Sequence, residues 1–298
     1  MNKHIGSIKR WRVQIFAITW LAYAAFYFTR KAFSVAKLGI GEDPTFHLDK
    51  MAMANLDAIY LAAYAVGQFA WGMLADRFGP RVVVLGGLLI SAAAAVVMGS
   101  FATLPIFATC MLIQGLAQST GWSGLCKNIG SFYPAQQRGR VLGLWSSCYA
   151  FGGLVASPFA GWWAYTYIGS WHAAFISSAV VVAFVALLFF IFQRNKPEDV
   201  GLPAVEPEPQ LSAEEVQAQG KVSVLAPLRD ILRNRTVLTL GLAYFMLKPA
   251  RYAILLWGPV IVFEQMPSVG KVGAAIIPTS FELAGLLGPI MIGLASDK

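Results

Sequence analysis

Two adjacent cations, Arg30 and Lys31, lie inside an apolar segment that is long enough to span a lipid bilayer. A charge at the centre of a spanning helix costs about 2.5–3.5 kcal/mol, so such residues usually face a bundle interior or a water-filled path. Tyr23, Tyr27 and Arg30 are spaced i, i+4 and i+7, which places two phenols and a guanidinium on one helix face. This face has the chemistry to bind an oxyanion.

A second pair of cations, Lys248 and Arg251, occurs much later in the chain at a spacing of i, i+3. Arg30 and Lys31 are also compatible with side chains that merely extend to the membrane interface. The tyrosines beside Arg30 and the second cationic pair favour a lined pocket instead. One helix cannot form that pocket, so other helices must complete it.

The composition indicates a polytopic membrane protein. Of the 298 residues, 57% are hydrophobic and 13% are charged, and the mean hydropathy is +0.60. The net charge of +8 falls in short segments between apolar runs, where basic residues set topology, so we expect no nucleic-acid binding. Because the three cysteines lack metal-ligand spacing and no catalytic motif is present, we expect a carrier without metal or cofactor, and not an enzyme.

Apolar runs of about the 20 residues that cross a bilayer predict eight helices. They lie at about 12–36, 51–75, 81–101, 104–126, 141–167, 171–192, 236–262 and 272–295. Lys and Arg are concentrated in alternate connections, which places the N-terminus and segment 193–235 in the cytoplasm and segment 42–50 in the periplasm. We therefore expect a multi-pass protein of a bacterial inner membrane.

The chain divides into three parts. Residues 1–192 are predicted to form a six-helix transmembrane bundle, and residues 236–298 to supply two more helices. Between them, the proline-rich and polar segment 193–235 is predicted to be a cytoplasmic linker with a short surface helix at Ser212–Gln219.

A glycine-aspartate-cation motif ends both the second and the eighth predicted span. A single copy would be compatible with an ordinary charged turn, whereas two copies six helices apart favour an internal repeat. The residues concerned are Gly72, Asp76, Arg77, Gly79 and Arg81 in the first copy and Asp297 with Lys298 in the second.

On this motif the chain resembles the major facilitator superfamily, whose loop between the second and third helices carries G-x-L-x-D-R-x-G-[RK]-[RK]. Pro80 here replaces the first of the last two cations. The resemblance implies an all-α membrane protein with two six-helix bundles and the substrate between them at mid-membrane. Because it also implies twelve helices, we expect a complete N-terminal bundle followed by the first two helices of a truncated C-terminal bundle.

Within that superfamily the chain resembles the organophosphate:phosphate antiporters, which include glycerol-phosphate, hexose-phosphate and sugar-phosphate transporters. The positions that carry the resemblance are Tyr23, Tyr27, Arg30, Lys31, Ala63, Tyr64, Gly67, Gln68, Gly121, Trp122, Lys127, Gly139, Trp145, Gly152, Gly153, Arg251, Tyr252, Trp257, Pro259, Glu282, Ala284 and Gly285. The resemblance implies that Arg30 and Arg251 jointly hold a phosphate group. It also implies alternating-access exchange of an organophosphate for inorganic phosphate, and we expect a monomer in the bilayer.

Other charged residues are expected to support this site. Unpaired charges inside a bundle are costly, so Lys31, Glu282 and Asp57 are interpreted as members of ion pairs that hold the empty site together. Lys248 adds a cation near Arg251.

Departures from the family pattern, Leu256 before Trp257 in place of an aspartate among them, leave the organic part of the substrate open. Gln68 stands where bacterial glycerol-phosphate and hexose-phosphate transporters have a lysine, and Tyr149 stands where the glycerol-phosphate transporter has a histidine. Tyr149 either donates its hydroxyl to the phosphate or is a packing residue.

Two alternative functions remain. One is a sugar-phosphate sensor built on the same fold, which would bind the ligand but signal instead of transporting it. The other is a proton-coupled carrier of a non-phosphorylated organic anion, in which Glu282 or Asp57 would relay the proton.

Overall fold

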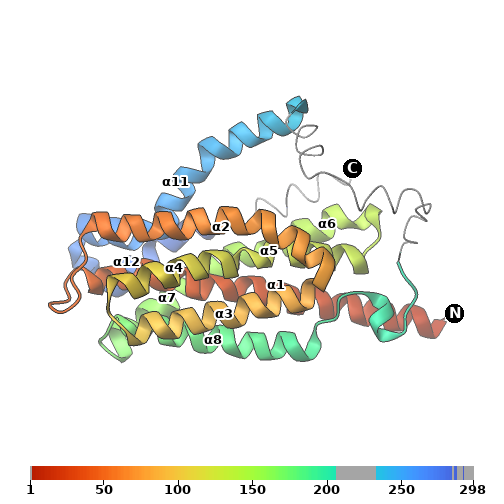
Figure 1. Ribbon diagram of the computed structural model, residues 1–298, viewed down its shortest axis with the longest axis horizontal. Helices are drawn as coiled ribbons and strands as arrows, with labels where there is room; N and C mark the ends of the chain where they lie inside the picture. The colour runs from red at the N-terminus through yellow and green to blue at the C-terminus, as the bar shows by residue number, and fades with distance from the viewer. Residues whose placement is uncertain (1, 206–232, 284, 287–290, 292–298) are drawn as a thin grey trace. The chain divides into compact units, whose positions relative to one another are not determined.

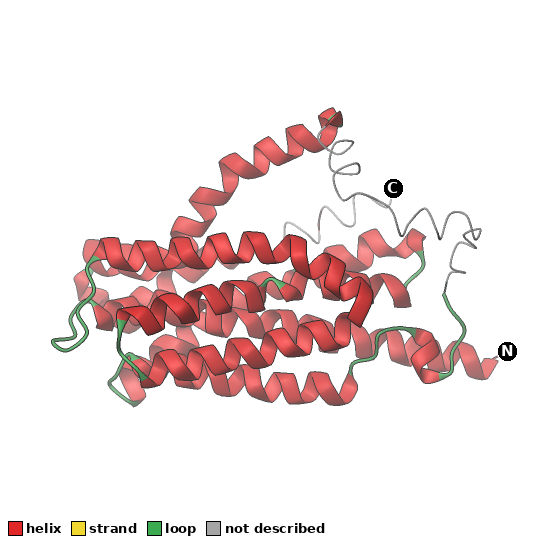
Figure 2. Cartoon of the chain, viewed as in Figure 1, coloured by secondary structure: helices red, strands yellow, loops and turns green. Residues whose placement is uncertain are grey.

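The structure is a computed structural model that describes residues 2–205, 233–283, 285, 286 and 291. Within these residues all regular secondary structure is helical, as Figures 1 and 2 show. The expected all-α fold is therefore confirmed. The predicted surface helix at Ser212–Gln219 and the second motif copy at Asp297 lie outside the described residues.

The helices of the first two hundred residues form one bundle (Figure 1). Their bounds are α1 Asn2–Ile40, α2 Lys50–Phe78, α3 Pro80–Ser100, α4 Leu104–Gln118, α5 Thr120–Phe132, α6 Ala135–Trp145, α7 Ser147–Trp162, the π-helix Trp163–Tyr167, α8 His172–Phe192 and the 3-10 helix Pro197–Val200. The later part of the chain contains α11 Arg235–Gln265, the 3-10 helix Pro267–Val269, α12 Gly270–Ile276 and the 3-10 helix Ile277–Thr279.

The fourth and fifth predicted spans are each divided into two helices. The segment predicted at 104–126 breaks at Ser119, and the segment predicted at 141–167 breaks at Ser146. Both serine hydroxyls donate to a backbone carbonyl 2.7 Å away in the preceding turn, that of Leu116 and that of Leu142 respectively. Such hydroxyls compete with backbone hydrogen bonds and bend helices. Hydrophobicity alone therefore located the segments but not their interruptions.

Four helices in the described part of the chain, α2, α3, α8 and α11, are individually long and apolar enough to cross a membrane. The 39-residue α1 is longer, but three of its buried side chains are the cations Arg30, Lys31 and Lys37, which lower its hydropathy. Cationic side chains on a long buried helix are typical of a polar path through a bundle.

The chain forms two compact units. The first contains residues 1–205 and 255–298, and the second contains residues 206–254, so the boundary falls within α11. In the first unit, α1 packs against α7 and α8, and α2 packs against α4. The predicted domain limits at 192 and 235 stay a prediction.

Two glycines allow other helices to approach the backbones of α1 and α2 closely. A Cβ atom at Gly115 of α4 would lie 2.4 Å from the carbonyl oxygen of Tyr60, and one at Gly152 of α7 would lie 2.8 Å from that of Ala24. Small residues at such crossings let the backbones meet, which is how helices associate in membranes. This close packing brings the polar faces of α1, α2 and α4 together.

Candidate functional site

Arg30 lies on α1 inside the bundle and is 6% exposed. Its Nε donates a 3.0 Å hydrogen bond to Oε1 of Gln118 on α4, and its guanidinium lies 4.7 Å from the ring centroid of Tyr27 and 5.0 Å from that of Tyr64. Among the described residues, no carboxylate pairs with Arg30 and its Nη2 has no hydrogen-bond partner. Arg30 is therefore a buried cation whose partners are all neutral.

Gln118 connects this guanidinium to a buried polar network. Its Oε1 also accepts a 2.8 Å bond from the Tyr60 hydroxyl, while its Nε2 donates to Oε1 of Gln114 at 2.6 Å. The same Nε2 lies 3.2 Å from the Thr29 hydroxyl and 3.3 Å from the Ser91 hydroxyl. Because both ends of the amide are occupied, the network fixes its orientation, with the oxygen toward the guanidinium.

Sequence reasoning did not single out Gln118. The available signal was the pair Gln114 and Gln118, two amides spaced i, i+4 in an otherwise apolar segment. Both are buried, at 2% and 0% exposure. Since buried amides need partners, such a pair in a spanning helix indicates a polar interior face.

Tyr23 and Tyr27 lie next to each other on α1, with ring centroids 6.2 Å apart. The ring of Tyr23 also packs against Trp122 and Trp145, at centroid distances of 5.4 and 5.6 Å. Both tyrosines are buried. The predicted face of two phenols and a guanidinium is thus assembled, and its role in binding an anion stays a prediction.

Lys37 forms a buried ion pair with Asp57 of α2. The two residues are 2% and 4% exposed. The Lys37 ammonium also donates to the Leu256 carbonyl at 3.0 Å and lies 4.2 Å from the Trp257 ring centroid. Sequence reasoning placed Asp57 in an ion pair but did not name Lys37. The signal was that Lys37 and Asp57 are opposite charges on two consecutive helices, Lys37 three residues before the end of α1 and Asp57 seven residues after the start of α2.

Lys31 and Ser34, also on α1, donate to α11. The Lys31 ammonium lies 3.1 Å from the Leu255 carbonyl oxygen, and the Ser34 hydroxyl lies 3.2 Å from the same oxygen and 2.9 Å from that of Leu256. Lys37 contacts the same part of α11, and the side chains of Lys31, Ser34 and Lys37 are all buried.

Two other predicted site residues lie near α7. Glu282 is 3% exposed and packs on Gly153, where a Cβ atom would lie 2.8 Å from the Glu282 carboxyl carbon. Tyr149 is half-buried on α7. A glycine at 153 therefore makes the space that the carboxylate occupies.

Lys248 and Arg251 belong to the second unit. There the Lys248 ammonium lies 5.5 Å from the Tyr244 ring centroid and 5.9 Å from that of Tyr252. The expectation that Arg30 and Arg251 jointly hold a phosphate group therefore stays a prediction.

The charged motif at the end of α2 and the start of α3 is anchored to α5 and to the segment that follows α8. Asp76 pairs with Lys127 of α5, and the backbone N–H of Arg81 donates to Oδ1 of Asn195 at 2.8 Å. Gly79 has a φ of 80°, and a Cβ atom there would lie 2.8 Å from Nδ2 of Asn195. The backbone conformation thus favours glycine at position 79, and a larger residue there would also displace the Asn195 amide. The remaining members, Gly72 and Arg77, are not tightly packed.

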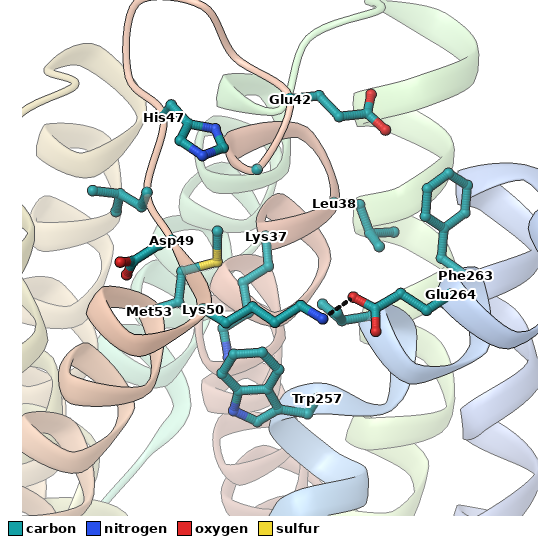
Figure 3. Close-up of a pocket in the computed structure, with 13 residues that line it drawn as sticks. Lys37, Leu38, Glu42, His47, Asp49, Lys50, Met53, Trp257, Phe263 and Glu264 are labelled. Atoms are coloured by element: carbon teal, nitrogen blue, oxygen red, sulfur yellow. Dashed lines mark ion pairs between the residues drawn. The ribbon is translucent and has the colours of Figure 1, made fainter.

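A cavity of about 420 Å³ lies beside the loop between α1 and α2 (Figure 3). Its lining includes Lys37, and its other charged residues are already engaged. Lys50 pairs with Glu264 at 2.7 Å, as Figure 3 shows, and Glu42 pairs with Lys271 at 2.6 Å. Asp49 caps α2 by accepting from the Ala52 N–H at 2.7 Å. This cavity therefore offers no uncompensated cation to an anion.

Residues 19–298 match the family model described as Major Facilitator Superfamily. The chain is also similar to solved structures of the fold. One of them is described as a bacterial homolog to the human lysosomal transporter Spinster in an inward-facing and unoccupied conformation. The similarity has a TM-score of 0.73 at 17% sequence identity and covers 93% of this chain and 61% of the other. At that identity the likeness shows the fold alone.

Three curated relatives are similar over 97% of this chain. They are a "Probable hexose phosphate transport protein" of Chlamydia muridarum at 27% identity, a "Phosphoglycerate transporter protein" of Salmonella typhimurium at 26%, and the "Membrane sensor protein UhpC" of Escherichia coli at 27%. The similar regions make up 65%, 64% and 65% of these relatives, so the chain spans just under two thirds of their length.

Proposed function

The chain belongs to the Major Facilitator Superfamily, and on this premise we propose that it acts in the exchange of an organophosphate for inorganic phosphate by alternating access. Members of this superfamily are multi-pass membrane carriers and not enzymes. In such carriers the substrate binds near the bilayer midplane and the surrounding helices rock around it. The site residues must therefore bind an anion tightly enough for selection and weakly enough for release.

The observation that carries the proposal is the environment of Arg30. A buried cation normally pairs with a carboxylate, because an uncompensated charge in a bundle is costly. Arg30 instead has an amide and two aromatic rings as partners and one nitrogen without a hydrogen bond among the described residues. These groups hold the guanidinium without neutralising it, so its charge stays available for a ligand.

The geometry of a guanidinium favours a phosphate group. Its planar set of donors matches two phosphate oxygens at once, which the single ammonium of lysine does not. We place Arg251 opposite Arg30 in the complete site, with Lys248 nearby, Tyr23 and Tyr27 beside Arg30, and Tyr149 as a hydroxyl donor. The names of the hexose-phosphate and phosphoglycerate relatives support a phosphorylated organic substrate.

The test is phosphate exchange by the full gene product in proteoliposomes loaded with inorganic phosphate. Arg30→Lys keeps the charge but loses the planar donor set, so the affinity for phosphate should fall about tenfold to a hundredfold, which corresponds to one charge-assisted hydrogen bond. Hexose 6-phosphate and phosphoglycerate, added outside, should compete with uptake of labelled phosphate by the unmodified protein.

Arg12→Lys is the matched control. Arg12 lies on the same helix, donates through its Nε to the Phe132 carbonyl at 2.8 Å, and lies 5.4 Å from the Tyr133 ring centroid. It shares the cation and ring contact of Arg30 but is only half-buried, in the first third of α1. Exchange by this variant should stay within about twofold of normal. Normal exchange by Arg30→Lys, or equal losses in both variants, would reject the proposal.

The sensor is the second candidate, favoured by the similarity to a protein named as a membrane sensor. A sensor would bind the organophosphate at the same residues but would not exchange it. Retained binding of hexose 6-phosphate together with no phosphate exchange in proteoliposomes would favour this function.

We also place the N-terminus in the cytoplasm and the loop between α1 and α2 in the periplasm, because basic residues gather on the side of the N-terminus. A cysteine introduced at the exposed Thr45 should react with an impermeant thiol reagent added to intact cells. Protection of this position in cells, with reaction in broken membranes, would reverse the topology.

A further inference from the structure

Three donors on one face of α1 bind two consecutive carbonyl groups of α11. Lys31, Ser34 and Lys37 are spaced three residues apart, so they form a row along the helix. Their hydrogen bonds to the carbonyls of Leu255 and Leu256 have lengths between 2.9 and 3.2 Å. The contact joins the first bundle to the part of α11 in the same compact unit.

Pro259 explains why the Leu255 carbonyl is available. In an α-helix the carbonyl of residue 255 accepts from the N–H of residue 259, but position 259 is a proline and has no N–H. The carbonyl is therefore left without its helical partner at a buried position, where a missing hydrogen bond is costly. Lys31 supplies the missing donor, and the Ser34 hydroxyl lies within hydrogen-bond distance of the same oxygen.

We propose that this contact, made by Lys31, Ser34 and Lys37 with the Leu255 and Leu256 carbonyls, is a latch that keeps the end of the carrier beside the α1–α2 loop closed. The inference rests on the proposed carrier function, because only a carrier must open and close at this end. The latch must release before a substrate can pass there. The two ion pairs at the same end, Lys50 with Glu264 and Glu42 with Lys271, each include an exposed carboxylate, so each contributes little.

Asp57 makes release of the latch reversible. It belongs to α2 and therefore stays beside Lys37 when α11 moves away. On opening, Lys37 exchanges the Leu256 carbonyl for water or for an oxygen of an incoming anion, but its charge stays compensated. Without Asp57, opening would leave a lone ammonium in the bundle, which is far more costly than the loss of one hydrogen bond.

The test measures access to the cavity in the absence of substrate, so its failure is distinct from failure of the transport proposal. A single cysteine replaces Met53, a buried residue that lines the cavity, in a full gene product in which Cys110, Cys126 and Cys148 are serine or alanine. The rate of labelling by a bulky polar thiol reagent is measured in detergent, where membrane orientation has no influence.

Ser34→Ala removes one hydroxyl and no charge. It should raise the labelling rate about twofold to tenfold, the effect of one net hydrogen bond on a closed–open equilibrium. Lys37→Met combined with Asp57→Leu removes the ammonium without leaving an unpaired carboxylate, and it should raise the rate further.

Lys271→Met is the matched control, since it breaks an ion pair at the same end outside the latch. It should change the labelling rate less than twofold. Unchanged or slower labelling in Ser34→Ala, or an increase in Lys271→Met as large as that in Ser34→Ala, would overturn the latch. If the double variant fails to insert, the Ser34→Ala comparison decides the question alone.

Discussion

Arg30 and Lys37 are two buried cations on the same face of α1, two helical turns apart, and they are held in opposite ways. Lys37 has a carboxylate, a carbonyl and an aromatic ring as partners. Arg30 has an amide and two rings, with no carboxylate partner among the described residues. The first environment neutralises its cation and the second only orients it.

The difference separates two uses of a charge inside a membrane bundle. A compensated cation such as Lys37 can bind and release neutral groups of a moving helix while it keeps its carboxylate partner. An uncompensated cation such as Arg30 is stabilised fully only when an anion arrives, so its cost is repaid on binding. Burial alone does not distinguish the two, since both side chains are almost inaccessible.

The largest effect is expected from Asp57→Asn. This change leaves the Lys37 ammonium buried without its carboxylate, which should destabilise the protein by about 3–5 kcal/mol. Thermal unfolding in detergent would show a clear loss of stability. The control is Lys37→Met combined with Asp57→Leu, which removes both charges and should be close to neutral or stabilising. A double variant as unstable as Asp57→Asn would mean that packing, and not charge compensation, is the role of this pair.

An intermediate effect is expected from Gln118→Glu, which gives Arg30 the kind of partner that Lys37 has. The new carboxylate should neutralise the guanidinium, and the affinity for phosphate should fall about tenfold or more. Stability should also fall to some extent, because a carboxylate cannot donate to Oε1 of Gln114 as the amide does, while the new ion pair with Arg30 offsets part of this loss.

Gln118→Leu serves as the comparison for this variant, since it removes the Arg30 partner without adding charge. Its defect should be mainly in stability, with about 1–3 kcal/mol lost as several buried polar groups lose a partner. Phosphate binding and unfolding measured on both variants would separate these outcomes. Tighter phosphate binding by Gln118→Glu would contradict the view that the Arg30 charge is kept available for an anion.

The smallest effect is expected at the α1–α2 loop. The Trp171 indole N–H, the Thr45 hydroxyl and the Thr45 N–H donate to Asp43 and hold the pKa of its carboxyl well below the usual range. A lowered folded pKa means that this stabilisation is complete above the unfolded value near 4 and is lost as the pH falls toward the folded value.

The loop of the unmodified protein should therefore become slightly less ordered as the pH falls below about 4. Asp43→Asn should remove this pH dependence and leave phosphate exchange at neutral pH nearly unchanged. Trp171 fluorescence followed between pH 6 and pH 2 would report this change. An acid-dependent signal of the same size in Asp43→Asn would assign it to another group.

The helical segments were predictable because each is a long apolar run, but the contacts of their polar residues were not. The expected position of α2 differs from the observed helix by only a few residues. The breaks at Ser119 and Ser146 were missed because serines such as Ser34 and Ser91 also lie inside continuous helices. Arg30 stood out because it is charged. Gln118 and Lys37 did not, since the partners that give them importance, Arg30 and the Leu256 carbonyl, are far away in the chain and only the packing brings them together.

The missing N–H of Pro259 has a consequence for how polarity is encoded in membrane proteins. A helix normally acquires a ligand for a cation by adding a polar residue, which every hydropathy scale records. Here the ligand is a peptide oxygen between two leucines, obtained by deleting one hydrogen four positions further on. This stretch of α11 is therefore apolar when it inserts into the bilayer, whereas in the folded protein its free carbonyl provides a buried dipole beside a cation. Sites of this kind are invisible to composition and can be found by looking for a proline four residues after any buried carbonyl that faces a cation.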